Sequence, residues 1–278
     1  MTKAFVYQIY YDAASRARLL PGFIPLDNTR NERPDWYEFW VILSFLRANA
    51  LEDGAWYGFL SPRFQEKTGF DDEFVLPFLQ QADESDNVAL FTNGWDQLAF
   101  FLNPWEQGEV WHPGVRALSQ AFLDKIGLDV DLGTLVTDLS TSVFCNYVVA
   151  KREFWIAWQQ IAEKFFAFAE GGDHGGAFSR ATSYGYGAGS ASMKTFIQER
   201  FASLLLATGN FNALVPDQSQ WATIFTAIFA DDPHTRRLLK SCDLFKSRYR
   251  QKQDASDLEM YWKTRRDIRY TPPPLAVP

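Results

Sequence analysis

Four short groups of polar and aromatic residues in this 278-residue chain are candidates for chemistry. Three of them follow the ends of predicted strands, and the fourth lies within the last predicted strand. In open α/β sheets, ligands bind outside the carboxyl ends of the strands, so these groups are the first candidates for a binding site. The groups are Tyr10-Tyr11-Asp12, Ser61-Pro62-Arg63-Phe64, Asn93-Gly94-Trp95-Asp96 and Asn146-Tyr147.

Arg63 has the most distinctive chemistry of these residues. A guanidinium offers a planar fork of donors to a phosphate group and keeps its charge when it is desolvated. The alternative is an ordinary salt bridge to Glu66 or Glu73, which follow it closely in the chain. The sequence therefore leaves two roles open for Arg63, one toward an anionic ligand and one structural.

Two residues have side chains suited to moving a proton. Asp96 could act as a general base, with Trp95 beside it to stack on the face of a sugar. Its alternative role is the N-cap of a helix over 97–102. His112 lies in a loop rich in Trp, Pro and Gly, where it could bind a phosphate or carry a proton; a loop-stabilising hydrogen bond is the alternative.

Glu199 and Arg200 stand just before an apolar helical stretch. They could hold the hydroxyl groups of an acceptor, or they could form an internal ion pair. The common signatures of other chemistries are missing from the chain, which has scattered histidines, no Cys cluster, no phosphate-binding loop and no nucleophile elbow. No metal ligands are therefore predicted.

Strands alternate with helices through the first half of the chain, which predicts an α/β fold with a mostly parallel sheet flanked by helices, followed by a helical C-terminal part. A nucleotide-binding part is expected over 1–170, a glycine-rich flexible loop over 171–192 and the helical part over 193–278, with a single continuous domain as the alternative. Strands are expected over 4–11, 55–60, 87–93 and 142–150, and helices from Asp35 and over 72–81, 115–126, 151–169, 196–207, 221–229 and 234–270.

Composition limits the class of protein. Hydrophobic residues make up 47% and aromatic residues 17%, so a globular chain with a heavy core is expected, although aromatic rings also line sugar and nucleotide pockets. No apolar run reaches the roughly 18 residues of a membrane span, and no cleavable signal pattern is found. Cys145 and Cys242 favour a reduced cytoplasmic protein, with one disulfide as the alternative.

The charge is unevenly placed along the chain. The formal net charge is −7, yet the segment from His234 to Tyr270 holds 11 Lys and Arg against 5 Asp and Glu. This basic tail predicts either peripheral contact with an anionic membrane surface or a helix that docks on acidic neighbours. Nucleic acid is not expected as a partner, because the rest of the chain is acidic.

Several segments together resemble bacterial glycosyltransferases of the GT-A type that assemble polysaccharide and lipopolysaccharide. The likeness covers roughly residues 4–210, and it implies a Rossmann-like sheet that binds a nucleotide-sugar and passes its sugar to a polysaccharide or lipid-linked glycan acceptor. The segments are Val6-Tyr-Gln-Ile-Tyr-Tyr11, Tyr57-Gly-Phe-Leu-Ser-Pro-Arg-Phe64, Phe144-Cys-Asn-Tyr-Val-Val-Ala-Lys-Arg-Glu-Phe-Trp155 and Glu199-Arg-Phe-Ala-Ser-Leu204.

The resemblance also implies roles for single residues. It places Gln8, Tyr10 and Asp12 near the nucleotide, and Ser61 and Arg63 near the diphosphate. On the sugar or acceptor side it places Asn146 and Tyr147.

One departure from the pattern of these enzymes concerns the metal. The Asp-x-Asp that commonly holds a divalent cation is replaced at the expected strand end by Ser61-Pro62-Arg63, while the acidic pairs Asp71-Asp72 and Asp129-Val-Asp131 fit helix caps better. We therefore expect Arg63 to neutralise the diphosphate and no resident cofactor to be needed, with a divalent metal as the alternative. A non-catalytic carbohydrate- or partner-binding protein on a degenerate transferase fold is the second functional hypothesis.

Overall fold

The computed structural model describes residues 3–172, 174–183, 190–220 and 228–272. These residues form two compact units, and each unit is built from three separate chain segments. Unit 1 consists of Met1–Asn93, Cys145–Gly171 and Leu204–Pro216, and unit 2 of Gly94–Phe144, Gly172–Ser203 and Asp217–Pro278. The expected division into successive stretches differs from these units, because the chain leaves unit 1 and returns to it twice.

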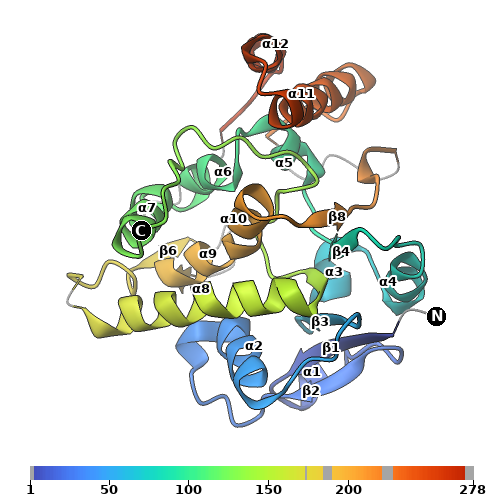
Figure 1. Cartoon of the computed structure of the whole chain (residues 1–278), viewed down its shortest axis with the longest axis vertical. Coiled ribbons are helices and arrows are strands. Elements are labelled where there is room, and N and C mark those ends of the chain that lie inside the picture. Colours follow the sequence, from blue (N-terminus) through green and yellow to red (C-terminus); the bar gives the residue numbers. More distant parts are fainter. Residues whose placement is uncertain (1–2, 173, 184–189, 221–227, 273–278) are drawn as a thin grey trace. The chain divides into compact units, whose positions relative to one another are not determined.

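A six-stranded, mostly parallel sheet forms the centre of unit 1 (Figure 1). The strand order is β2-β1-β3-β5-β4-β8, and every neighbouring pair is parallel except the two that involve β5. The α/β class with a mostly parallel sheet is thus as predicted. The strands are β1 (Ala4–Tyr10), β2 (Ile24–Asp27), β3 (Trp56–Leu60), β4 (Asp86–Leu90), β5 (Val148–Lys151) and β8 (Asn212–Leu214).

Helices bury both faces of the central strands, which explains why β1 and β3 are rich in aromatic and β-branched residues. On one face Phe59 of β3 packs between Phe45 of α2 (Tyr37–Ala48) and Trp155 of α8 (Arg152–Gly171), with ring centroids 4.9 and 5.0 Å away. On the other face, Val6 and Val149 join a core that includes Phe64 of α3 (Phe64–Thr68) and residues of α4 (Asp72–Leu79). Much of the aromatic excess therefore serves the core.

One expected strand and one expected helix start differ from the structure, and one strand of the sheet was not expected. The strand predicted over 142–150 begins only at Val148, because Val143 bonds through its N–H and C=O to the Ser203 hydroxyl rather than to a strand. Strand β2 was not expected, because it is an exposed edge strand that contains Pro25 and shows no alternation of buried and exposed residues. Asp35 does not cap α2; it pairs with Arg33 within the preceding 3₁₀ turn.

Unit 2 is mainly helical, and the predicted helical part over 193–278 contributes α9, α11 and α12 to it. A hairpin of β6 (Ala181–Ser183) and β7 (Ser190–Ser192) lies in the glycine-rich segment, where no packed element was expected. Residues 184–189 of the expected glycine-rich flexible loop and most of the predicted helix over 221–229 lie outside the described residues. The helices are α5 (Trp95–Phe100), α6 (Pro104–Trp111), α7 (Val115–Lys125), α9 (Met193–Gln198), α11 (Pro233–Lys252) and α12 (Ala255–Arg266), while α10 (Phe201–Thr208) continues into unit 1.

Among the described helices, none combines the length and the apolar character that crossing a bilayer requires. Of the expected caps, Asp71 does begin α4, where its carboxylate accepts the N–H of Phe74 at 2.9 Å. Asp131 instead accepts the N–H of Gly133 in a turn that no helix follows.

Gly58 of β3 leaves no room for a side chain. A Cβ atom there would lie 2.7 Å from Cγ2 of Val149 on the neighbouring β5. We predict that Gly58→Ala lowers the free energy of unfolding by about 1–3 kcal/mol through overpacking. Urea unfolding measures this change. The matched control is Gly171→Ala at the end of α8, where a Cβ meets nothing within 4 Å; an equal loss in both variants would contradict the overpacking.

Candidate functional site

The carboxyl edge of the sheet in unit 1 contains a topological switch point. Strand β1 continues through α1 (Ala13–Arg16) to β2 on one side, whereas β3 continues through α3 and α4 to β4, which lies on the other side. The chain therefore diverges between the adjacent strands β1 and β3. In open α/β sheets, a ligand crevice forms outside the carboxyl ends of strands at such a point.

Gln8 and Ser61 lie on these two strands but serve first to shape the edge. The Gln8 side chain is buried, donates to the Ser61 carbonyl at 3.3 Å, and accepts the N–H of Leu20 at 2.7 Å. Its amide thus ties the loop after α1 to the end of β3. We conclude that Gln8 holds the edge of the sheet in place. Ser61 is the slightly more exposed residue of this pair.

Tyr147 reaches the same edge because β5 is antiparallel to its neighbours, so that its first residues lie beside the last residues of β3 and β4. The Tyr147 hydroxyl is 3.2 Å from the Ser61 hydroxyl, and the Tyr147 carbonyl accepts the N–H of Phe91. Burial raises the pKa of Tyr147, against a smaller lowering by Lys67. Asn146 is half-buried immediately before it.

Tyr10 and Asp12 end β1. Asp12 is the N-cap of α1, where a capping box with Ser15 holds its carboxylate and lowers its pKa. Tyr10 is 8% exposed, and its contact with Asp27 of β2 raises its pKa. The backbone N–H of Thr29 likewise lowers the pKa of Asp27, so the carboxylates of Asp12 and Asp27 are both engaged in local structure.

Arg63 forms the salt bridge that sequence analysis offered as its alternative role. Its Nε lies 3.0 Å from Glu66 Oε2, and the two side chains are 45% and 56% exposed. An ion pair this exposed contributes about 0–1 kcal/mol, because water screens both charges. A ligand with two negative charges can therefore compete with Glu66 for the guanidinium.

Three cationic side chains act on this edge, of which sequence analysis identified only Arg63. Arg63, then Arg18 and Lys67 lower the pKa of Glu66, and Arg18 and Arg63 also oppose the rise in the pKa of Tyr11 that its burial causes. Lys67 stands four residues after Arg63, a spacing that places both on one side of α3, so this signal was present in the sequence. No feature of the sequence around Arg18 indicated that it would act on this edge.

A pocket of about 480 Å³ opens beside the carboxyl end of β2. It lies between the end of that strand, the loop that follows, and α2. The loop starts next to β1, since the Asn28 N–H donates to the Tyr10 carbonyl at 2.8 Å. Its lining residues are Leu26, Asp27, Asn28, Thr29, Arg30, Glu32, Trp40, Val41, Ser44 and Phe45.

The remaining predicted site residues belong to unit 2 and are mostly buried there. Trp95 is 2% and Asp96 0% exposed, both in the first turn of α5, whose N-cap is Gly94. His112, at the end of α6, stacks on Phe196 with ring centroids 3.5 Å apart. Trp95 therefore packs in the core rather than offering a face to a sugar.

Arg200 is 2% exposed and forms hydrogen bonds inside unit 2. It donates to the carbonyls of Pro104 and Phe196 at 2.8 and 2.5 Å, and to Gln107 Oε1 at 3.0 Å. The half-buried Glu199 precedes it as the C-cap of α9. Arg200 thus connects the turn after α9 to α6. Its guanidinium therefore has a structural role.

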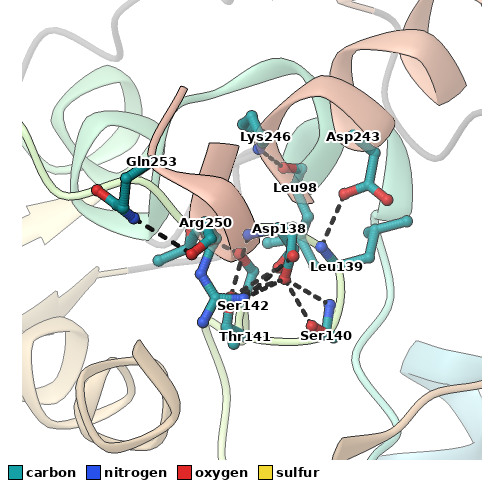
Figure 2. Close-up of polar contacts among 11 residues, drawn as sticks. Leu98, Asp138, Leu139, Ser140, Thr141, Ser142, Asp243, Lys246, Arg250 and Gln253 are labelled. Atoms are coloured by element: carbon teal, nitrogen blue, oxygen red, sulfur yellow. Dashed lines mark hydrogen bonds and ion pairs between the residues drawn. The ribbon is translucent and has the colours of Figure 1, made fainter. Parts of the chain in front are cut away.

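A second group of charged residues joins α11 to the end of α5 and to the loop at 138–142, and Figure 2 shows it. The fully buried Lys246 ammonium donates to the carbonyls of Leu98 and Phe101 at 2.6 Å each, at the end of α5. Burial lowers the pKa of Lys246 to about 8, although Asp243 and Asp138 attract its charge. The cation therefore satisfies carbonyls that a helix end leaves without partners.

The same helix contacts the loop at 138–142. Arg250 lies 3.1 Å from both carboxylate oxygens of Asp138, which also accepts the hydroxyls of Ser140 and Thr141 (Figure 2). Asp243 accepts the N–H of Leu139 at 2.8 Å, and burial raises the pKa of Asp243 to about 6. These contacts hold α11 in place within unit 2. The buried charged residues of this group therefore have a structural role.

The described residues contain no group of three or more His, Cys, Asp or Glu side chains arranged to hold a metal ion. Comparisons of the chain with protein families, curated proteins and solved structures gave no match. The geometry of the carboxyl edge in unit 1 is thus the basis for a functional proposal.

The buried Lys246 gives the stability of the protein a pH dependence that can be measured. Between pH 8 and the ordinary pKa of 10.5, the unfolded chain holds a proton that the folded chain has lost, so the free energy of unfolding rises with pH. Lys246→Met lacks this contribution. We predict that the difference, wild type minus Lys246→Met, grows by roughly 2 kcal/mol from pH 8 to pH 10.

Denaturant unfolding at several pH values measures that difference. Lys240→Met, on the exposed side of the same helix, is the matched control, and its profile should run parallel to that of the wild type. A Lys246→Met profile that is also parallel would show that the ammonium keeps an ordinary pKa.

Proposed function

We propose that this protein is a glycosyltransferase, which moves a sugar from a nucleotide-sugar donor to a polysaccharide or lipid-linked glycan acceptor. The observation that carries the proposal is the switch point between β1 and β3, which has Ser61 and Arg63 at its rim and Arg18 and Lys67 acting on the same edge. A Rossmann-like sheet of the GT-A type, suggested by the resemblance of the segments, fits this arrangement.

The charge of the edge suits a diphosphate. A leaving nucleoside diphosphate develops negative charge as its bond to the sugar breaks, and donors placed where that charge develops accelerate the reaction. Arg63 offers a fork of donors, while Arg18 and Lys67 add positive charge to the field. In this proposal the diphosphate displaces Glu66 from Arg63, and a divalent metal is an alternative source of the same charge.

The pocket beside β2 suits the nucleoside of the donor. Its volume of about 480 Å³ lies in the range of small-molecule sites, and it combines the apolar Val41 and Phe45 with the polar Asp27 and Ser44. A carboxylate at the end of the second strand of such a sheet is well placed to accept a ribose hydroxyl. We assign this role to Asp27, next to Tyr10 at the end of β1.

The reaction follows from these positions. An acceptor hydroxyl attacks the anomeric carbon, a new C–O bond forms to that carbon, and its bond to the diphosphate oxygen breaks with the electron pair leaving on the diphosphate. The acceptor proton passes to a general base. The residues that the sequence suggested for this role and for the acceptor, Asp96, His112, Trp95, Glu199 and Arg200, are not assigned to this donor site, because they belong to unit 2 and most of them are buried there. Asn146 and Tyr147 belong to the sugar side in this proposal.

A non-catalytic carbohydrate- or partner-binding protein is the second candidate. The burial of Asp96 favours it, because a general base must reach the acceptor hydroxyl. Both candidates fit a cytoplasmic location, which Cys145 and Cys242 support because neither forms a disulfide.

A panel of nucleotide-sugars separates the two candidates by thermal shift. We predict that one nucleotide class among UDP-, GDP-, CMP- and dTDP-sugars raises Tm by about 5 °C at a hundredfold excess over Kd, because the ligand binds the folded state alone. Free glycans at the same concentration serve as the comparison. Stabilisation by glycans without any response to nucleotides would support the binding protein instead.

Substitutions at the salt bridge test the role of Arg63. We predict that Arg63→Ala weakens donor binding at least tenfold, about 1.4 kcal/mol, and lowers turnover. Glu66→Gln should strengthen donor binding severalfold, because it frees the guanidinium and removes a negative charge. Isothermal titration with the stabilising nucleotide-sugar measures both effects.

The control for these variants is Arg152→Ala, since Arg152 forms a similarly exposed ion pair with Asp53 at 2.7 Å, near the opposite edge of the sheet. Donor binding should be unchanged in this variant. If Arg63→Ala bound the donor as tightly as Arg152→Ala, Arg63 would have no part in holding the diphosphate.

A further inference from the structure

The structure divides the basic residues of α11 and α12 into two groups. Those in the first group are used inside unit 2: Lys246 on backbone carbonyls, Arg250 with Asp138, Arg265 with Glu106, Arg236 with Asp231 and Arg248 with Asp257. Those in the second group are exposed, and none of them lies within ion-pair distance of a carboxylate among the described residues: Arg237, Lys240, Lys252, Lys263, Arg266 and Arg269.

Helical spacing places part of the second group on the outward side of α11. Leu239, Cys242 and Lys246 are buried and face the core of unit 2. Arg237, Lys240 and Leu244 recur at intervals of three and four residues on the opposite side. Leu244 is 55% exposed four residues after Lys240, so an apolar side chain stands beside the cations of this side.

Helix α12 repeats this arrangement beside α11 (Figure 1). Tyr261 is buried in the same core cluster as Leu239, so the outward sides of both helices point away from one shared core. Lys263 and Arg266 lie on the outward side of α12. Met260 and Trp262 flank them and are 42% and 38% exposed.

We propose that this surface of α11 and α12 docks on an anionic lipid bilayer. We call it the basic surface and define it by Arg237, Lys240, Leu244, Lys252, Met260, Trp262, Lys263, Arg266 and Arg269. The exposed acids Asp254, Glu259 and Asp267 leave it with a net positive charge, while the whole chain carries −7. The net charge of this surface is therefore opposite to that of the whole chain, and it is this surface that would attract anionic lipids.

The mixture of cations with exposed apolar side chains selects a bilayer over other polyanions. Each Lys or Arg near an anionic leaflet contributes about 1 kcal/mol, and that attraction falls with salt. Leucine, methionine and tryptophan gain further free energy at the boundary between headgroups and acyl chains, whereas a nucleic acid backbone offers them no such environment. The inference does not rest on sugar transfer, although it would bring the protein to lipid-linked acceptors.

Flotation of the full chain with vesicles tests the proposal. Vesicles of phosphatidylcholine alone are compared with vesicles that contain phosphatidylglycerol at roughly a third of the lipid, in 50 mM and 500 mM NaCl. We expect binding to the anionic vesicles in low salt, at least a fivefold loss in high salt, and no binding to the neutral vesicles.

Three variants locate the contact. Arg237→Gln with Lys240→Gln should reduce vesicle binding at least fivefold. Leu244→Ser should reduce it two- to threefold at unchanged net charge, and its exposed position spares the fold. Lys125→Gln with Lys164→Gln removes the same charge from exposed positions elsewhere and should bind as the wild type does.

Circular dichroism and thermal unfolding verify that every variant is folded. The proposal is overturned if the wild type ignores anionic vesicles, or if the Lys125 and Lys164 variant loses as much binding as the Arg237 and Lys240 variant. A further result would overturn the proposal in favour of a surface that binds polyanions in general. In that result Leu244→Ser binds vesicles as the wild type does, and a short duplex DNA displaces the vesicles equally from both proteins.

Discussion

The six-stranded sheet of unit 1 depends on the position of β5 between β3 and β4. Without that strand, β2-β1-β3 and β4-β8 would be two separate groups of parallel strands with no hydrogen bonds between them. Val149 pairs with Gly58 on one side and with Ala89 on the other, and the absence of a side chain at Gly58 gives Val149 room. The reversed direction of β5 also carries Tyr147 to the edge where β3 and β4 end, beside Ser61.

The same strand positions the helix that covers the sheet. Helix α8 begins directly after β5, so its first turns bring Trp155 against Phe59. The Trp155 indole N–H donates to the Tyr57 carbonyl at 2.9 Å, which satisfies a polar group in an otherwise apolar layer. One short antiparallel strand thus sets the order of the sheet, the position of α8 and the residues at the edge.

Charged residues have different consequences according to their burial. Lys246 and Asp138 lie inside unit 2, where their partners fix α11 and where their protonation bears on stability. Arg63 and Glu66 are about half exposed, so their pair contributes little and stays open to exchange with a ligand. The sequence left a ligand role open for both Arg63 and Arg200, yet Arg200 is buried and donates to three acceptors inside unit 2.

The sequence by itself determined the class of the fold, β1 and β3, and the helical C-terminal part, because hydrophobic periodicity and β-branched runs are local signals of burial. It also placed Tyr10, Asp12, Ser61 and Arg63 at strand ends. Only the tertiary structure decided that β5 is short and antiparallel, that β2 forms an exposed edge and that Trp95, Asp96 and Arg200 are buried. These features depend on contacts between residues far apart in the chain, which no local pattern records.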